Sequence, residues 1–524
     1  AVRTKIVEAM QDIAFKTFSK KTIPAHLMNA ARQEGWGKKV FSDPIAGELS
    51  WRRFWALVGL LQKGFEASGD CVAVLLPTGV AAFASAVALQ GQKKLPAFLN
   101  PAAGKTALQD QIVLSGAKTL ITARPFLQAM KLEENFFSVP VLYIEDILRG
   151  ASPWSRLQAL LGFFRTAMTS ASGDPKSGAL VFFTSGTEGK PKGVLLSHEA
   201  LSANVAQIRS VIDVRPSDVF FSSLPLFHAF GFTAGALVPL YSGSKVAFAL
   251  SPLQRRKVAE GAYWKNATVL FGTDTFLRQW GKAADPLDFD ELRVVVSGAE
   301  RLTEETKSLW GGHFGQRLHE GYGLTETSPV LALNTRMFFR EGSVGKPLPG
   351  VEIVFHPLEG LEKGGEMFLK APNLMEGYLD TEGKAHLPES EVGPGWFATG
   401  DVGYLDGDGY LFIVGRKKRM AKVGGELVPL GAVEALAEHL SPHHLHAALA
   451  FPAKTRGEDI VLVTTDPNLT VAILRKAAAE KGMAAMAAPR RVLVVPSMPR
   501  LGTGKVDYLR LTASLSESQA SPPS

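Results

Sequence analysis

The run Phe183-Thr184-Ser185-Gly186-Thr187-Glu188-Gly189-Lys190-Pro191-Lys192-Gly193-Val194 joins an apolar strand to a loop that is dense in hydroxyl side chains and glycines. Phosphate oxygens need close donors, and glycines allow backbone N–H groups to approach while hydroxyls and a lysine add further donors and charge. The pattern differs from the P-loop because Lys192 is followed by Gly193. The run therefore predicts a phosphate-binding loop, with an ordinary Gly-rich turn as the alternative.

Short apolar runs on both sides of this loop alternate with helix-like segments. Five of them are residues 72–76, 119–122, 179–184, 268–271 and 293–296. Such alternation is typical of parallel sheets covered by helices on both faces. We therefore expect an α/β fold, with a large N-terminal domain of two helix-covered sheets.

The pattern of apolar residues and turns changes toward the C-terminus. Residues 342–415 have short strand patterns and Gly-rich turns, which predicts a β-rich subdomain. Residues 416–524 alternate helix and strand patterns and end in a Ser- and Pro-rich tail. We expect an N-terminal domain over 1–415 and a small α+β C-terminal domain over 416–524, since 524 residues exceed one ordinary core.

Composition places the chain among folded globular proteins, with 46% hydrophobic and 20% charged residues. The single cysteine, Cys71, allows no internal disulfide, and the first 21 residues mix charged with apolar residues, unlike a secretory signal. A cytoplasmic location is expected. The net charge of +7 favours acidic partners such as nucleotides, an anionic membrane or an acidic protein; a nucleic-acid partner is not expected.

Four further segments carry ligand-binding patterns. Gly321-Tyr322-Gly323-Leu324-Thr325-Glu326 offers a hydroxyl and a carboxylate, which suit a phosphate and a hard cation. Ser297-Gly298-Ala299-Glu300 is a small-residue turn at the end of a predicted parallel strand, where ligands bind. Asp401 offers two acceptor oxygens suited to a vicinal diol, and Lys505 lies in a Gly-rich loop.

Taken in order, these motifs resemble the adenylate-forming superfamily of acyl-CoA synthetases, luciferases and nonribosomal adenylation domains, over roughly residues 49–507. The resemblance implies ATP and Mg²⁺ as cofactors. It implies catalytic roles for Lys505, Thr184, Thr325, Glu326 and His228, with Glu326 and Thr184 at the metal. The nucleotide contacts that it implies are Thr184, Ser185, Gly186, Thr187, Gly189, Lys192, Gly298, Ala299, Glu300, Glu320, Gly321, Tyr322, Gly323, Thr325, Asp401, Arg416 and Lys505.

The family's hinge motif is altered in this chain. Where the family usually has Asp or Lys after its Gly-Arg pair, the run from Arg416 to Lys422 places Arg419. A basic residue can still absorb a change of backbone dihedral angles. The resemblance thus implies that the C-terminal domain is mobile about a hinge in this region, without fixing the pivot residue.

The acid substrate is expected to be a fatty acid. His228, in the segment 224–232, matches the family's acid-site motif and would lie beside the substrate carboxylate. No other charged residue lies between Leu224 and Leu240, and only Asp274 follows the apolar run 269–273. An apolar wall suits an alkyl chain, since burial contributes about 0.8 kcal/mol per methylene.

Three further segments, residues 269–273, Leu309-Trp310 with Phe314-Gly315, and residues 420–426, look most similar to bacterial acyl-acyl-carrier-protein synthetases, including the synthetase half of bifunctional acyltransferase/synthetases. This similarity implies acyl carrier protein as the acceptor, with CoA as the alternative; a phospholipid acyltransferase and a non-catalytic binding protein are further alternatives. The basic residues Arg416 to Arg419, Lys422, Arg490 and Arg491 would either guide an acidic carrier protein or form an ordinary solvated face.

Residues 153–170 form an unusually apolar, sided segment with Arg156 and Arg165 at its edge. One interpretation is an interfacial helix that makes peripheral contact with the inner face of a membrane. The other, of equal weight, is a helix packed on the domain.

Overall fold

The computed structural model describes residues 2–185, 191–453, 457–481, 488–500 and 506–520. These residues fall into two compact units, one comprising Ala1–Glu352 and Lys370–Glu389 and the other Ile353–Leu369 and Ser390–Ser524. The predicted site residues Gly186, Thr187, Gly189 and Lys505 lie outside the described residues. The mobile domain predicted from residue 416 onward stays a prediction.

One sheet of the first unit has eight strands in the order β19-β18-β8-β7-β4-β3-β5-β6. Strands β3, β4, β5, β6 and β7 are parallel to one another, whereas β8, β18 and β19 extend the sheet beyond β7 with antiparallel pairs. The strands are β3 (Cys71–Leu75), β4 (Leu95–Phe98), β5 (Leu120–Thr122), β6 (Val141–Tyr143), β7 (Gly178–Ser185), β8 (Pro191–Ser197), β18 (Gly377–Leu379) and β19 (Ala385–His386).

The second sheet of this unit has nine strands in the order β15-β14-β13-β12-β11-β9-β10-β1-β2. The six central strands, β13, β12, β11, β9, β10 and β1, are parallel, and β2, β14 and β15 add antiparallel pairs at the two edges. The strands are β1 (Lys39–Asp43), β2 (Gly47–Ser50), β9 (Val219–Ser222), β10 (Lys245–Phe248), β11 (Val269–Gly272), β12 (Val294–Ser297), β13 (Leu318–Gly323), β14 (Val330–Leu333) and β15 (Lys346–Pro347).

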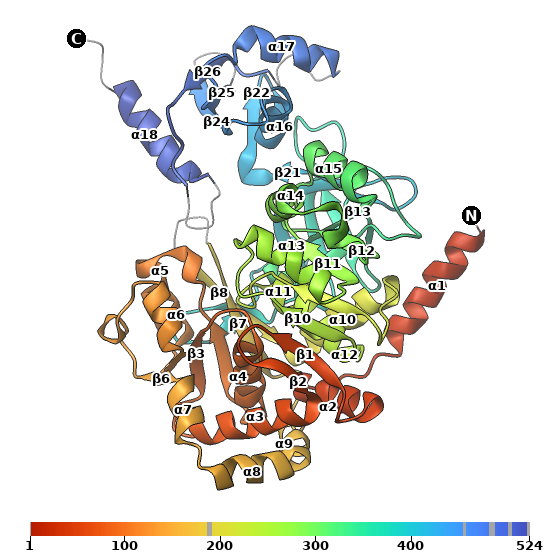
Figure 1. Ribbon diagram of the computed structural model, residues 1–524. Helices are drawn as coiled ribbons and strands as arrows, with labels where there is room; N and C mark the ends of the chain where they lie inside the picture. Colours follow the sequence, from red (N-terminus) through yellow and green to blue (C-terminus); the bar gives the residue numbers. More distant parts are fainter. Residues whose placement is uncertain (1, 186–190, 454–456, 482–487, 501–505, 521–524) are drawn as a thin grey trace. The chain divides into compact units, whose positions relative to one another are not determined.

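Helices cover both sheets (Figure 1). Trp280 and Trp310, which are fully buried, pack with Val295 and the other buried side chains of one face of the nine-stranded sheet. The α-helices are α1 (Val2–Lys16), α2 (Ile23–Glu34), α3 (Trp51–Gly64), α4 (Val80–Gly91), α5 (Lys105–Ser115), α6 (Arg124–Ala129), α7 (Ile144–Gly150), α8 (Pro153–Leu161), α9 (Phe163–Ser170), α10 (His198–Val211), α11 (Ala229–Phe232), α12 (Val238–Tyr241), α13 (Arg255–Trp264), α14 (Asp274–Ala283) and α15 (Glu304–Phe314). Shorter turns are η1 (Pro101–Ala103), η2 (Glu134–Phe136), the π-helix η3 (Thr233–Leu237), η4 (Pro286–Phe289) and η5 (Thr325–Thr327).

The second unit contains two smaller sheets. The antiparallel order β16-β17-β20-β21 makes one, and β23-β22-β25-β24, with β26 on β25, makes the other. Their elements are β16 (Glu352–His356), β17 (Gly365–Lys370), β20 (Phe397–Leu405), β21 (Leu411–Arg416), η6 (Lys417–Arg419), β22 (Met420–Val423), β23 (Glu426–Pro429), α16 (Leu430–Leu440), β24 (His446–Ala453), β25 (Gly457–Thr464), α17 (Val471–Glu480), β26 (Arg491–Val494) and α18 (Tyr508–Ala520).

The predicted fold class is confirmed, with two helix-covered sheets and a smaller α+β part. Two local differences stand out. The region 1–65 contains the hairpin β1–β2, which the sequence analysis did not predict, and residues 153–170 form two helices that are divided at Gly162 rather than one. Among the described helices, none combines the length and the apolar character that crossing a bilayer requires.

Candidate active site

The parallel strands β11, β12 and β13 end in register at one edge of the nine-stranded sheet. Gly272 on β11 pairs with Ser297 on β12, and Ser297 pairs with Glu320 on β13. The turn that follows β12 and the last residues of β13 therefore lie side by side, as expected for the carboxyl ends of parallel strands. This register brings the predicted segments Gly298–Glu300 and Gly321–Gly323 to the same edge.

Small residues allow these two turns to pass close to their neighbours. A Cβ atom on Gly298 would lie 3.1 Å from the ring of Phe230, and one on Gly323 would lie 1.8 Å from the carbonyl oxygen of Pro329. Ala299 has φ +67°, a left-handed conformation that is uncommon for a residue with a side chain. Such conformations cluster at ligand sites, where the surrounding structure holds them in place.

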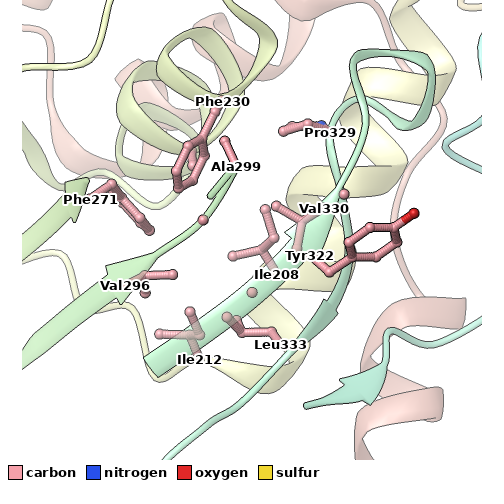
Figure 2. A pocket seen from close by; sticks show the side chains of 14 residues that line it. Ile208, Ile212, Phe230, Phe271, Val296, Ala299, Tyr322, Pro329, Val330 and Leu333 are labelled. Carbon is pink, nitrogen blue, oxygen red and sulfur yellow. The ribbon is translucent and has the colours of Figure 1, made fainter. Parts of the chain in front are cut away.

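These turns border an apolar pocket with a volume of about 480 Å³, which includes space open to solvent (Figure 2). Figure 2 shows Phe230 and Phe271 on one side of the pocket and Tyr322 and Leu333 on the other. The remaining lining residues are Ile208, Ile212, Ala234, Val296, Gly298, Ala299, Gly321, Gly323, Pro329 and Val330. None of the lining residues is charged, so the pocket suits an alkyl or aryl group.

The acidic residues next to the pocket are bound elsewhere. Asp274 is buried and accepts hydrogen bonds from the backbone N–H and the hydroxyl of Thr303, at 2.8 and 2.9 Å. Glu300 accepts a hydrogen bond from the backbone N–H of Thr275 at 2.9 Å, in the first turn of α14. Both carboxylates are therefore engaged by groups of the protein at the starts of α15 and α14, so neither serves as an unpartnered counter-charge for a cationic group in the pocket.

His228 directly precedes α11, two residues before the pocket residue Phe230. Its ring lies 4.8 Å from the ring of Phe227, and its side chain is half-buried. The carbonyl oxygen of His228 accepts the hydrogen bond from the backbone N–H of Phe232, so the backbone of His228 is fixed at the start of the helix. The segment predicted to contain the acid site is thus the one that supplies a wall of the pocket.

A second group of predicted residues lies around Tyr378 on β18. The Tyr378 hydroxyl donates a hydrogen bond to Oε1 of Glu326 at 2.7 Å, and Nζ of Lys192 lies 4.5 Å from the centre of the Tyr378 ring. On the paired strands β7 and β8, Thr184 is opposite Lys192, so their side chains are on the same face of the sheet. Three predicted ligand residues from two separate motifs, Thr184 and Lys192 from one and Glu326 from the other, are therefore brought to one place.

A single carboxylate in this group fits Mg²⁺ held together with substrate phosphates. Mg²⁺ is usually bound by one or two carboxylates plus phosphate oxygens rather than by a cage of protein ligands. Glu326 is the carboxylate, and Thr184 and Thr325 add hydroxyls; no cluster of three or more His, Cys, Asp or Glu side chains suited to a metal is found among the described residues. The donor set suits a metal that arrives with a nucleotide.

Glu320 lies at the end of the same strand as Tyr322 but is paired within the protein. Its carboxylate is 3.5 Å from Nζ of Lys307. Burial raises the pKa of Glu320, although the charge of Lys307 opposes the shift. The neighbouring His319 is also buried, which lowers its pKa to about 4 and keeps its imidazole neutral.

In the second unit, Asp401 and Arg416 face each other on the paired strands β20 and β21. Arg416 Nε donates to Oδ1 of Asp401 at 2.8 Å, and the aspartate is buried while the arginine is exposed. The backbone N–H of Asp401 also donates to the Thr399 hydroxyl at 3.0 Å. The two predicted ribose contacts are therefore held together as an ion pair.

The basic run after Arg416 is largely matched by acidic side chains. Lys417 pairs with Glu366, Arg419 with Glu434 and Lys422 with Glu359. Arg419 also lies 3.8 Å from the centre of the Tyr508 ring. Because these ion pairs offset much of the positive charge, the run gives less support to electrostatic guidance of an acidic partner than its composition suggested.

Tyr378 and Lys307 are contacts that the sequence analysis did not find. Tyr378 lies in Glu376-Gly377-Tyr378, outside the motifs considered, and reaches Glu326 only because β18 pairs with β8. Lys307 is one of three Lys and Glu residues at the start of α15, and it pairs with Glu320 only in the folded chain. No signal in the sequence distinguishes Lys307, whereas the tyrosine beside a glycine in a short strand was a weak signal.

Comparison with known proteins places this geometry in context. Residues 29–379 match the AMP-binding enzyme family. A probable CoA ligase of Humulus lupulus is 30% identical over 464 residues, which cover 84% of this chain and 85% of that protein. The long-chain-fatty-acid–CoA ligase of Salmonella typhimurium is 28% identical over 340 residues, with 63% and 60% covered. The structure of ATP-bound MatB from Rhodopseudomonas palustris superposes with a TM-score of 0.77 at 24% identity, covering 94% of this chain and 99% of MatB.

Proposed function

The chain belongs to the AMP-binding enzyme family, and from this we propose that it activates a fatty acid with ATP and transfers the acyl group to a carrier thiol. The observation that carries the proposal is the apolar pocket, whose rim is made by the predicted nucleotide-binding turns Gly298–Ala299 and Gly321–Gly323. An acyl chain in the pocket would have its carboxylate at this rim. The alkyl group and the nucleotide would then meet where the chemistry takes place.

On the nucleotide side, each predicted residue has a role suited to its chemistry. Thr184, Ser185 and Lys192, with Gly186, Thr187 and Gly189, would bind the phosphates through hydroxyl, ammonium and backbone N–H donors. Tyr322 would stack near adenine beside Gly298 to Glu300 and Glu320 to Gly323. Asp401 and Arg416 would bind the ribose, since a carboxylate accepts from both hydroxyls of a vicinal diol.

In the first step, a carboxylate oxygen of the fatty acid attacks the α-phosphorus of ATP, an O–P bond forms, and pyrophosphate leaves. Thr184, Thr325 and Lys505 would stabilise the negative charge that develops on the phosphate oxygens. Glu326 and Thr184 would bind Mg²⁺, which when bound withdraws charge from those oxygens. His228 would hold the attacking carboxylate of the fatty acid. Tyr378, which donates a hydrogen bond to Glu326, would keep the Glu326 carboxylate oriented.

In the second step, a thiol attacks the carbonyl carbon of the acyl-adenylate, so that a thioester forms and AMP leaves. The thiol proton passes to solvent or to a base. Two displacements replace one difficult condensation, which is the general advantage of an activated intermediate. We propose that movement of residues 416–524 about the hinge near Arg419 withdraws Lys505 between the two steps.

Acyl carrier protein is the proposed acceptor, on the strength of the detailed motif match described for the sequence. CoA is the second candidate, and it is favoured by a specific observation, namely that the curated relatives of Humulus lupulus and Salmonella typhimurium are named as CoA ligases. The ion pairs along Lys417 to Lys422 also reduce the electrostatic support for an acidic partner. The carrier protein and a membrane surface remain proposed partners.

Product analysis with labelled palmitate, ATP and Mg²⁺ tests the proposal, with holo acyl carrier protein, CoA or lysophospholipid added in turn. We expect AMP, pyrophosphate and one labelled thioester, and palmitate-dependent exchange between ATP and pyrophosphate without any acceptor. Labelled CoA thioester alone would select the second candidate. Acyl transfer to lysophospholipid without ATP, or no exchange with any acid, would contradict the proposed activity.

Lys505→Ala tests whether Lys505 acts in adenylate formation and not in thioester formation. We expect adenylate formation to be abolished while thioester formation from preformed acyl-AMP is largely retained. The matched control is Lys481→Ala, which removes an exposed lysine in the same unit. Equal loss of both half-reactions in Lys505→Ala would contradict the assigned role.

A further inference from the structure

Helices α8 and α9 present an apolar stripe to solvent. Trp154, Leu157 and Leu161 recur at intervals of three and four residues along α8, and Phe164 and Met168 continue this spacing on α9. Their exposed fractions are 65%, 44%, 64%, 41% and 49%. Isolated exposed apolar side chains are normal, whereas a continuous row marks an interaction surface.

The inner faces of the two helices already fix them to the domain. Trp36 contacts the rings of Phe163 and Phe164 edge-on, with ring centres 5.0 and 5.6 Å apart. The Gln62 side-chain amide of α3 donates to the Ser170 hydroxyl at 2.9 Å, and α8 and α9 pack along α3 (Figure 1). Apart from Phe164, whose ring contacts Trp36, the outward stripe is therefore not required to hold the helices in place.

Arg156 and Arg165, on α8 and α9, have no acidic neighbours in the sequence, whereas Arg32 and Arg52 come from α2 and α3. No Asp or Glu lies between Asp146 and Asp174. Among the ion pairs of the described residues, none includes Arg32, Arg52, Arg156 or Arg165. The Arg32 and Arg52 guanidinium groups lie 5.3 and 5.5 Å from the ring centres of Phe164 and Phe163, at the border of the stripe.

We propose that α8 and α9 form a docking surface for an anionic phospholipid bilayer, with the apolar stripe inserted among the acyl chains and the arginines against the headgroups. Apolar residues with a tryptophan on one face and basic residues at the edge are the composition of helices that lie in a membrane interface. A second copy of the chain is a poorer occupant, because a two-fold contact would bring the same unpaired arginines of both copies together.

Sedimentation of the full chain with lipid vesicles tests the proposal. We expect binding to vesicles made of phosphatidylcholine and phosphatidylglycerol in equal parts, and much weaker binding to phosphatidylcholine alone. Trp154→Ser with Leu161→Ser should lower the partition coefficient by roughly tenfold or more, since two large apolar side chains lose their burial. Arg165→Gln should lower it about fivefold on the anionic vesicles only.

A matched control exists on α13 and the turn before it. Trp264 and Leu253 are exposed by 76% and 70%, so Trp264→Ser with Leu253→Ser removes equivalent apolar surface elsewhere in the same unit. We expect this variant to bind vesicles like the wild type. Because all four positions are exposed, thermal unfolding and ATP–pyrophosphate exchange should be unchanged in both double variants.

Three results would overturn the proposal. The first is equal binding to neutral and anionic vesicles, and the second is an equal loss of binding in the control variant. The third is self-association without vesicles that Trp154→Ser with Leu161→Ser abolishes, since the stripe would then be an interface between copies. Quenching of tryptophan fluorescence by brominated lipid that disappears in Trp154→Phe would locate insertion at α8 and support the proposal.

Discussion

Replacing Ala234 with leucine would shorten the pocket without touching the residues proposed to bind the nucleotide. Ala234 lines the pocket from η3 and is 1% exposed. Leucine adds three carbon atoms, which would occupy the space of about three methylenes of an acyl chain. At about 0.8 kcal/mol per buried methylene, the lost burial is roughly 2.4 kcal/mol, or about fiftyfold in kcat/KM for an acid that fills the pocket.

The assay is pyrophosphate exchange with a series of saturated acids of increasing length. For the wild type we expect kcat/KM to rise about fourfold per methylene until the pocket is full. In Ala234→Leu the rise should stop about three methylenes earlier, while acids too short to reach the leucine keep their wild-type values. These short acids are the internal control for damage to the fold.

Two outcomes would refute this reasoning. An equal loss for short and long acids would mean that the substitution disturbs the fold or the nucleotide site, because overpacking costs about 1–3 kcal/mol in a filled core. An unchanged length profile would mean that the acyl chain does not occupy the pocket between Phe230 and Leu333.

Three further predictions concern the fold and the site. Tyr378→Phe should raise the Mg²⁺ concentration needed for half-maximal exchange by about tenfold or more, since a hydrogen bond to a charged group contributes about 1.5–3 kcal/mol. An unchanged Mg²⁺ dependence would show that Tyr378 does not position Glu326. Gly323→Ala should destabilise the fold by about 3 kcal/mol or more in urea titrations, because its Cβ would lie 1.8 Å from the Pro329 oxygen, whereas Gly311→Ala on α15 meets nothing within 4 Å and should be neutral or stabilising. Burial lowers the pKa of His198 to about 4, so as the pH falls through about 6.5 the imidazole takes up a proton in the unfolded chain but not in the folded chain. The free energy of unfolding should therefore fall by roughly 2 kcal/mol between pH 7.5 and 5.0. Urea titrations of His198→Asn at these two pH values should show a smaller loss.

The parts of the fold that depend on local pattern were predictable from the sequence. The apolar run 293–296 becomes β12, Val294–Ser297, and the small-residue turn after it lies at the edge of the sheet where a ligand-binding turn was expected. Buried parallel strands need continuous apolar runs, and their ends need small residues. Both requirements concern consecutive residues, so they can be recognised in the sequence alone.

The features that escaped prediction depend on distant partners. Strand β1 contains Ser42 and Asp43 among its buried residues and pairs with β10, about two hundred residues away, so neither alternation nor an apolar run reveals it. Asp43 is buried because its carboxylate accepts from the backbone N–H of Val80 at 2.7 Å, at the start of α4. A buried carboxylate with such a partner looks, in sequence, like an ordinary turn residue.

The same distinction applies to the candidate site. The chemistry-bearing residues Lys192 and Glu326 were found because each stands in a dense local motif, but Tyr378, which contacts both, belongs to a three-residue strand. A tyrosine can donate to the carboxylate and still lie beneath the ammonium of Lys192 because β18 continues the sheet beyond β8. Short strands at a sheet edge, whose residues carry little pattern of their own, are therefore where residues that position a carboxylate would be sought in this fold.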